Sequence, residues 1–203
     1  IKELSKVRGV HSAMWCDGKK ALLDVWSNLS VPKQLDFLSL ENGKANTLKT
    51  FSSPFADFDF PKIDALSLKA SDGQKLNARL ILPAGFDPAK KYPVLVYTYG
   101  GPHAQLIDNS WTGGAGFWLN LMAQQGYVVF TLDNRGSANR GFEFESIIHR
   151  QCGEKEMADQ MAGVEYLKTL DYVDADKIGV DGWSYGGFLT TSLFLRNPGI
   201  FKV

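Results

Sequence analysis

The 203-residue sequence is poor in the residues that mark several common classes of protein. Its two cysteines, Cys16 and Cys152, lie far apart, so they have neither the spacing of a metal site nor the number of a disulfide framework. No apolar run is long enough to span a bilayer. Lys plus Arg and Asp plus Glu both total 22, which favours neither nucleic acid nor an anionic membrane as a partner. We therefore expect a globular chain without membrane insertion, nucleic acid, metal or cofactor.

Residues 1–52 have the pattern of short antiparallel strands separated by tight turns. Strands are expected at Val10–Trp15, Ala21–Trp26 and Gln34–Leu40, with turns at Asp17-Gly18 and Asn42-Gly43, where glycine allows positive φ. A meander of three or four strands cannot bury both of its faces alone, so we expect it to pack on a structure outside this chain.

A change of pattern follows the segment 53–61, which has little periodicity and two prolines, and which we interpret as a linker. From residue 62 onward, apolar runs alternate with helical patterns, and this alternation predicts an α/β domain with a parallel sheet over 62–203. A hairpin is expected first, with strands at 63–69 and 76–82 joined by a turn at Ser71-Asp72-Gly73. Further strands are expected at 93–99, 127–132 and 177–180, and helices at 117–125, 154–170 and 188–196. The helix over 154–170 has an apolar stripe made of Met157, Met161, Val164 and Leu167.

The stretch DGWSYGGF fits the G-x-S-x-G pattern of a nucleophile elbow, with Ser184 at its centre. A strand precedes it and a helix follows it, as that strained turn requires. Small residues are needed at positions 182, 186 and 187, where the sequence has Gly182, Gly186 and Gly187, because backbone passes close by. We expect the N–H of Tyr185 to face a developing oxyanion. A glycine-rich turn with an incidental serine is the alternative, but strand, spacing and helix all favour the elbow.

A second oxyanion donor is expected in the loop that follows an early strand of such a domain. In PVLVYTYGGPHAQ this loop starts at Tyr99, whose hydroxyl could be the donor in place of a backbone N–H. The alternative is an aromatic residue at a strand end with its hydroxyl in water.

The partners that would activate the serine do not follow it in this sequence. In α/β-hydrolases the chain order is Ser, then Asp or Glu, then His, but residues 185–203 contain none of these acids and no His. His11, His103 and His149 all precede Ser184; only His103, close to the oxyanion loop, is a conceivable base, and it would need a different chain order. We expect an α/β-hydrolase domain cut after the nucleophile elbow, with its acid and base beyond Val203.

The glycine-rich stretch DNRGSANRG lacks the Lys-Ser/Thr of a P-loop and the glycine spacing of a dinucleotide site. We expect Arg135 and Arg140 to brace loops through hydrogen bonds instead. Glu145, Glu154 and Glu156 match no motif and are interpreted as charges on helix surfaces.

Four segments together resemble the prolyl oligopeptidase family of serine peptidases: GWSYGGF, YGGPHAQ, DNRGSANRGFEFE and EMADQMAGVEYLK. The similarity is greatest to its dipeptidyl peptidase IV branch, and especially to the prolyl tripeptidyl peptidases of Bacteroidetes. It covers 62–203, and residues 1–52 resemble the last blade of the β-propeller that precedes the hydrolase domain in that family. The resemblance implies that Ser184 is the nucleophile and that Tyr185 and Tyr99 supply the oxyanion donors. It also implies that Tyr185 and Trp183 contact substrate, with the Tyr185 ring bordering a proline pocket.

The resemblance implies a serine exopeptidase that releases Xaa-Pro or Xaa-Xaa-Pro from peptide N-termini, so that substrates carry proline at the second or third position. It further implies a homodimer of the full-length protein and a periplasmic or extracellular location. The chain alone is expected to be inactive because the acid and base are missing. The alternatives are a prolyl endo-oligopeptidase or acylaminoacyl peptidase, a carboxylesterase, which the propeller-like start disfavours, and an inactive hydrolase-fold binding module, which the intact Ser184 disfavours.

Overall fold

The computed structural model describes residues 3–203, which form two compact units. The first unit consists of the chain up to Asp59 together with Asp108–Gly114, and the second of Phe60–Ile107 with Ala115–Val203. The return of 108–114 to the first unit has no counterpart in the sequence pattern. Here the 3-10 helix η1, Trp111–Gly114, approaches the sheet of that unit, because the N–H of Trp111 donates to Ser27 Oγ at 3.3 Å and its ring stacks on Phe55 at 5.8 Å.

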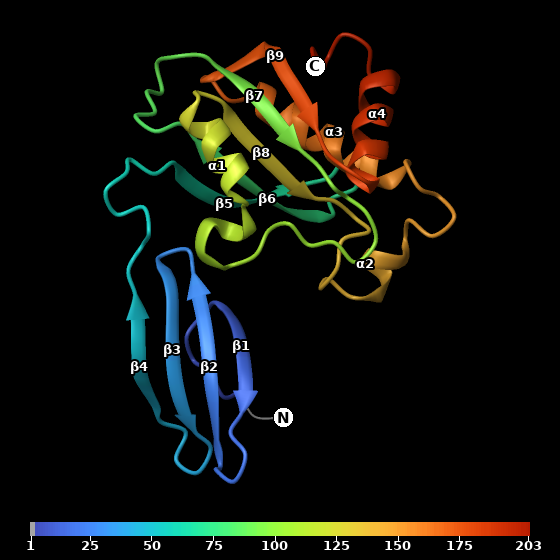
Figure 1. Ribbon diagram of the computed structural model, residues 1–203. Helices are drawn as coiled ribbons and strands as arrows, with labels where there is room; N and C mark the ends of the chain where they lie inside the picture. The colour runs from blue at the N-terminus through green and yellow to red at the C-terminus, as the bar shows by residue number, and fades with distance from the viewer. Residues whose placement is uncertain (1–2) are drawn as a thin grey trace. The chain divides into compact units, whose positions relative to one another are not determined.

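The first unit is a four-stranded antiparallel sheet, as the sequence predicts, with the strands in chain order (Figure 1). Its strands are β1 Val10–Trp15, β2 Ala21–Asn28, β3 Val31–Ser39 and β4 Ala45–Phe51. Gly18 and Gly43 adopt φ of 68° and 70° in the two predicted turns, a backbone region in which glycine has no steric cost. Turn chemistry and alternation therefore define this unit locally.

The apolar core of this sheet is small. Its buried apolar residues are Ala21, Trp26 and Leu38, whereas Trp15 is 62% exposed and Met14 and Leu48 are each 56% exposed. A sheet with so many large apolar side chains in solvent buries too little surface for independent stability.

The second unit is a five-stranded mixed sheet with the strand order β5-β6-β8-β7-β9 (Figure 1). The strands are β5 Lys62–Lys69, β6 Lys75–Leu82, β7 Tyr92–Tyr97, β8 Val128–Asp133 and β9 Val173–Asp181. Strand β7 is parallel to both β8 and β9, but β6 is antiparallel to β5 and to β8. The predicted hairpin of β5 and β6 is confirmed, and β7, β8 and β9 are parallel as predicted, whereas the antiparallel pairing of β6 with β8 was not predicted.

Helices cover both faces of this sheet. They are α1 Phe117–Gln124, α2 Phe142–Ser146, α3 Lys155–Lys168 and α4 Tyr185–Arg196, and the sequence pattern indicates all of them except α2. Neighbouring residues of β8 point to opposite faces, as in any strand: Val129 packs in the cluster beneath α1, and Phe130 in the cluster beneath α3 and α4. The predicted stripe Met157, Met161, Val164 and Leu167 lies in or against this second cluster.

Candidate active site

Ser184 lies on a tight turn between the end of β9 at Asp181 and the start of α4 at Tyr185. Its φ of 56° and ψ of −122° place a non-glycine residue in a strained region of backbone space. The turn is closed by the N–H of Gly186, which donates to the Trp183 carbonyl at 2.9 Å. Ser184 itself is exposed, so the strand–turn–helix geometry predicted from the sequence presents its hydroxyl to solvent.

Two of the three glycines around Ser184 are required by close backbone approach. A Cβ on Gly182 or Gly186 would lie 2.4 or 2.3 Å from the carbonyl oxygen of Thr98, at the end of the neighbouring strand. A Cβ on Gly187 would meet nothing closer than 3.5 Å, which is an ordinary contact. The prediction that all three positions must be small is therefore right for Gly182 and Gly186 and wrong for Gly187.

The segment that follows β7 lies against the first turn of α4. A Cβ on Gly186 would be 3.1 Å from the Cα of half-buried Tyr99, and a Cβ on Gly101 would be 2.6 Å from Cγ of Tyr185. The fold thus brings Tyr99, Ser184 and Tyr185 into one region. The first N–H groups of a helix have no partner within it, and among the described residues none accepts a hydrogen bond from the Tyr185 N–H. This N–H is available to an anion.

The side chain of Tyr185 is held by a carboxylate that the sequence analysis misjudged. The Tyr185 hydroxyl donates to Glu156 Oε1 at 2.6 Å, and the Gly153 N–H lies 3.1 Å from each oxygen of the same carboxylate. Burial, followed by the neighbouring Cys152 and Glu156, raises the pKa of the Tyr185 phenol, which therefore stays protonated as a donor. Glu156 is fully buried, so its interpretation as a helix-surface charge is wrong.

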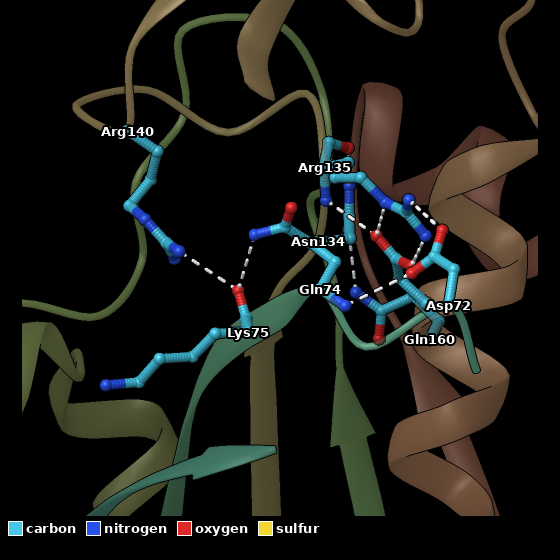
Figure 2. A network of polar contacts seen from close by, with 8 residues as sticks. Asp72, Gln74, Lys75, Asn134, Arg135, Arg140 and Gln160 are labelled. Carbon is cyan, nitrogen blue, oxygen red and sulfur yellow. Dashed lines mark hydrogen bonds and ion pairs between the residues drawn. The ribbon is translucent and has the colours of Figure 1, made fainter. Parts of the chain in front are cut away.

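A second buried polar contact braces the loop that carries Tyr99. Asn134 Nδ2 donates to the carbonyl of Gly100 at 3.0 Å. Gln160 Nε2 in turn donates to Asn134 Oδ1 at 2.8 Å (Figure 2). Both amide side chains are completely buried. Gly100 has φ of 65°, and a Cβ there would lie 2.6 Å from Asn134 Oδ1. The loop conformation beside Tyr99 is therefore fixed by glycine and by two amides.

Arg135 and Arg140 brace loops, as the sequence analysis expects (Figure 2). Arg135 pairs with Asp159 at 2.6 Å and with Asp72 at 2.5 Å, while Arg140 donates to the Lys75 carbonyl at 3.0 Å. The hydrogen bond to Asp159 raises the pKa of Arg135, and the hydrogen bond from Arg135 lowers the pKa of Asp72. The glycine-rich stretch thus ties β8, α3 and the β5–β6 turn together.

The histidines of this unit do not reach the serine. His103 is highly exposed and pairs with Glu145, and His149 is exposed in the turn after α2. Among the described residues, no side chain forms a hydrogen bond with Ser184 Oγ. Trp183 is 71% exposed beside the serine. A cavity of about 660 Å³ starts at Pro102 and His103, next to the Tyr99 loop, and extends along α2.

In the first unit, Ser5, His11 and Asp24 form a series of polar contacts. His11 Nδ1 lies 2.7 Å from Asp24 Oδ2, and its Nε2 lies 3.3 Å from Ser5 Oγ. That Nε2 is also 3.0 Å from the carbonyl of Val7, which can only accept a hydrogen bond. Ser5 Oγ also lies 3.4 Å from the Val7 carbonyl, so these contacts tie residues 5–7 to β1 and β2.

Within residues 3–203, no group of three His, Cys, Asp or Glu side chains is placed to hold a metal ion. In the same range no helix has both the length and the apolar character needed to cross a bilayer. The two cysteines are free thiols, with Cys16 partly buried and Cys152 exposed.

Comparisons with known proteins identify the family and the fold. Residues 116–203 match the prolyl oligopeptidase family. Dipeptidyl peptidase 8 of Mus musculus is 39% identical over 158 residues, which are 77% of this chain and 18% of that protein. Dipeptidyl peptidase 4 of Trichophyton equinum is 35% identical over 179 residues, 85% of this chain and 23% of that protein. The chain therefore spans about a fifth of the length of these curated relatives.

Two solved structures are similar over nearly the whole chain. A protein described as a dipeptidyl aminopeptidase IV of Bacteroides ovatus superimposes with a TM-score of 0.93 at 46% identity, covering 96% of this chain and 28% of that one. Dipeptidyl peptidase 4 of Porphyromonas gingivalis gives 0.89 at 30% identity, covering 99% and 29%. The four-stranded sheet corresponds to a propeller blade, and the mixed sheet to the start of an α/β-hydrolase domain. The chain belongs to the prolyl oligopeptidase family, in the branch of dipeptidyl peptidases 4 and 8.

Proposed function

We propose that the protein containing this chain is a serine exopeptidase that releases Xaa-Pro or Xaa-Xaa-Pro from the N-termini of peptides. The observation that carries the proposal is the strained turn at Ser184, with φ of 56° and ψ of −122°, between β9 and α4. The family description as prolyl oligopeptidase and the relatives' names as dipeptidyl peptidases support this substrate class. In the full-length protein, the units described here are a propeller portion over 1–52, a linker over 53–61 and a catalytic portion over 62–203.

In this reaction Ser184 Oγ attacks the carbonyl carbon of the scissile peptide bond, and the carbonyl oxygen gains negative charge in the tetrahedral intermediate. The Tyr185 N–H and the Tyr99 hydroxyl stabilise that charge, which develops only as the bond to Oγ forms. Collapse of the intermediate expels the amine and leaves an acyl-enzyme that water hydrolyses. A histidine base and its acid from outside residues 1–203 move the proton, so this chain alone is inactive.

Substrate contacts are assigned to two aromatic residues beside the serine. Trp183, 71% exposed, borders the bound peptide. The Tyr185 ring, packed on Gly101, borders a pocket for proline, a residue whose rigid φ lowers the entropy lost on binding. As in the family resemblance, the full-length protein is a homodimer that acts in the periplasm or outside the cell.

The test uses the full-length protein with chromogenic amides of Gly-Pro, Ala-Ala-Pro and N-blocked Gly-Pro, beside a Ser184→Ala variant. Cleavage of one free-amine substrate, lost by about a million-fold in the variant, supports the proposal and gives the length of the released peptide. Cleavage of the blocked substrate assigns an endo-oligopeptidase or acylaminoacyl peptidase instead. Activity on simple esters alone assigns a carboxylesterase.

A further inference from the structure

Helix α3 buries three polar side chains on one face. Glu156, Asp159 and Gln160 each have no exposed surface, and their i, i+3, i+4 spacing places them side by side. Burying such groups is costly unless each has a hydrogen-bonding partner. The helix nevertheless carries them where an apolar residue could pack, so we examine the hydrogen-bonding partners of Glu156 and Gln160.

Glu156 holds the start of α4. Its carboxylate accepts the Tyr185 hydroxyl at 2.6 Å, and the Tyr185 ring lies on Gly101, where a Cβ would be only 2.6 Å from Cγ. Because the ring is fixed at its tip and along its face, the backbone of Tyr185 is fixed with it. That backbone carries the N–H assigned to the oxyanion.

Gln160 holds the loop of the other donor. Its Nε2 orients Asn134 by a hydrogen bond of 2.8 Å to Oδ1 (Figure 2). This turns Asn134 Nδ2 toward the Gly100 carbonyl, at 3.0 Å. Gln160 also donates to the Leu132 carbonyl at 3.0 Å, so the relay is anchored to β8. The Gly100 carbonyl belongs to the peptide between Gly100 and Gly101, so this hydrogen bond holds the loop one residue after Tyr99.

We propose that Glu156 and Gln160 are positioning residues that preorganise the two oxyanion donors from one helix. Glu156 acts through the Tyr185 side chain on the Tyr185 N–H, and Gln160 acts through Asn134 and Gly100 on the Tyr99 hydroxyl. The inference rests on the proposed roles of Ser184, Tyr99 and Tyr185. Oxyanion donors stabilise a transition state only when they are already aimed at the developing charge, and their supporting residues decide how tightly they are aimed. Neither α3 side chain touches substrate.

The first test is a double-mutant cycle in the full-length protein with Tyr185→Phe and Glu156→Gln. Tyr185→Phe keeps the backbone N–H and removes only the hydroxyl that Glu156 holds. Each single variant is expected to lower kcat about tenfold with little change in KM, because the donor is misplaced and not removed. The double variant should lose no more than Tyr185→Phe alone, since Glu156→Gln weakens the hydrogen bond that Tyr185→Phe removes, by replacing a charged acceptor with a neutral one.

The second test is the corresponding cycle for the other donor, with Tyr99→Phe and Gln160→Met. Tyr99→Phe should lower kcat by about a hundredfold, as removal of an oxyanion donor does. Gln160→Met should lower kcat about tenfold in the wild-type background and little further in Tyr99→Phe. In the Tyr185→Phe background, Gln160→Met should keep its full effect, because it acts on the other donor.

Controls separate positioning from folding. Glu165→Gln makes the same chemical change as Glu156→Gln at an exposed position of α3, and should leave kcat, KM and the melting temperature unchanged. A peptide boronic acid, which forms a tetrahedral adduct on the serine, should lose affinity in parallel with kcat in every positioning variant. If Glu156 and Gln160 were needed only for folding, their variants would lower the concentration of active protein. The ratio of boronate affinity to substrate affinity would then stay unchanged.

Hydrogen–deuterium exchange gives a readout independent of activity. Gln160→Met should raise exchange in the segment 100–104 and leave the start of α4 unchanged. Glu156→Gln should raise exchange at the start of α4 and leave 100–104 unchanged. Fully additive kinetic cycles, or unchanged exchange in both segments, overturn the inference. A wild-type protein without Ser184-dependent hydrolysis overturns the proposed function, and the exchange results then still decide whether α3 holds these two segments.

Discussion

Both units of the chain bury carboxylates, but they use them in different ways. In the four-stranded sheet, Asp24 and Asp36 face each other across β2 and β3, a pairing of like charges that is unfavourable on its own. Each carboxylate accepts a hydrogen bond from a ring nitrogen 10 to 13 residues away, Asp36 from Trp26 and Asp24 from His11, both at 2.7 Å. These contacts join adjacent strands and reinforce their register.

In the mixed sheet, buried carboxylates join segments that are further apart in the sequence. Asp159 holds Arg135 over 24 residues, Glu156 holds Tyr185 over 29, and Asp133 accepts the N–H groups of Leu106 and Ile107 over 27 and 26. These partners lie in loops or at a helix start, around the candidate active site. The same chemical group therefore fixes strand register in the first unit and loop placement in the second. Substitutions in the first unit should change stability alone, and substitutions in the second should also change catalysis.

The largest expected effect is that of Asp159→Ala. The side chain of Arg135 is 8% exposed, so losing its buried partner leaves a charge poorly compensated and should cost about 3–5 kcal/mol of stability. Asp72→Ala removes a half-exposed partner of the same arginine and should cost far less. Urea unfolding measures both variants, and hydrogen exchange should localise the loss to the mixed sheet. Equal losses of stability in Asp159→Ala and Asp72→Ala would show that burial of the carboxylate does not decide the strength of its ion pair with Arg135.

Gly186→Ala is expected to have the next largest effect. Its Cβ would lie 2.3 Å from the Thr98 carbonyl oxygen, so the turn at Ser184 must shift, which should cost about 1–3 kcal/mol and lower kcat. Gly187→Ala is the matched control in the same helix turn, because its nearest contact is 3.5 Å. Alanine favours a helix over glycine by about 1 kcal/mol, so this variant should be as stable as the wild type or more stable. Melting temperatures and kcat measured side by side decide the matter.

Trp26→Phe tests the first unit. It removes the N–H that buried Asp36 accepts and should cost about 1–2 kcal/mol. Because this hydrogen bond joins only adjacent strands, exchange should rise in β2 and β3 while kcat and KM stay at wild-type values. A drop in kcat without a loss of folded protein would break the proposed division between the two units.

Asp133 has the smallest expected effect, and it depends on pH. Burial raises the pKa of this carboxyl from 3.8 to about 6, so between these values the folded state binds a proton that the unfolded state does not. Its contribution to stability therefore rises as pH falls, by about 1 kcal/mol between pH 7 and pH 5. Relative to Asp133→Asn, the wild type should gain this amount in urea unfolding at the two pH values. No change in the difference would place the pKa of Asp133 near its ordinary value.

Much of the secondary structure follows from local signals. Val10–Trp15 is β1 as predicted, and the predicted helix 154–170 is α3, Lys155–Lys168, because turn residues and periodicity act within a few positions. The hairpin of β5 and β6 follows from its local turn, but the antiparallel pairing of β6 with β8 was missed because it joins strands about fifty residues apart. Helix α2 has only five residues, too few to display a period.

The candidate site was predicted in part. The elbow around Ser184 is a local motif, so its place and its strain could be inferred. Glu156 was misjudged because the helix was assigned one apolar stripe and every charge was placed outside it. One signal was present: Gly163 lies on that helix, and a Cβ there would be 2.8 Å from the Phe130 ring, so the helix approaches the sheet closely and buries a wide face.

Most strands, turns and helices, and the place of Ser184, follow from side-chain period and from glycine at a few adjacent positions. Which loops meet at that serine, and which polar side chains hold them, depends instead on packing between distant segments. Glu156, Asp159 and Gln160 become buried only when α3 packs on the sheet and α4 and the loops after β7 and β8 close around it. Burial depends on surfaces brought from distant segments, and a carboxylate gains its partner only when those segments arrive together.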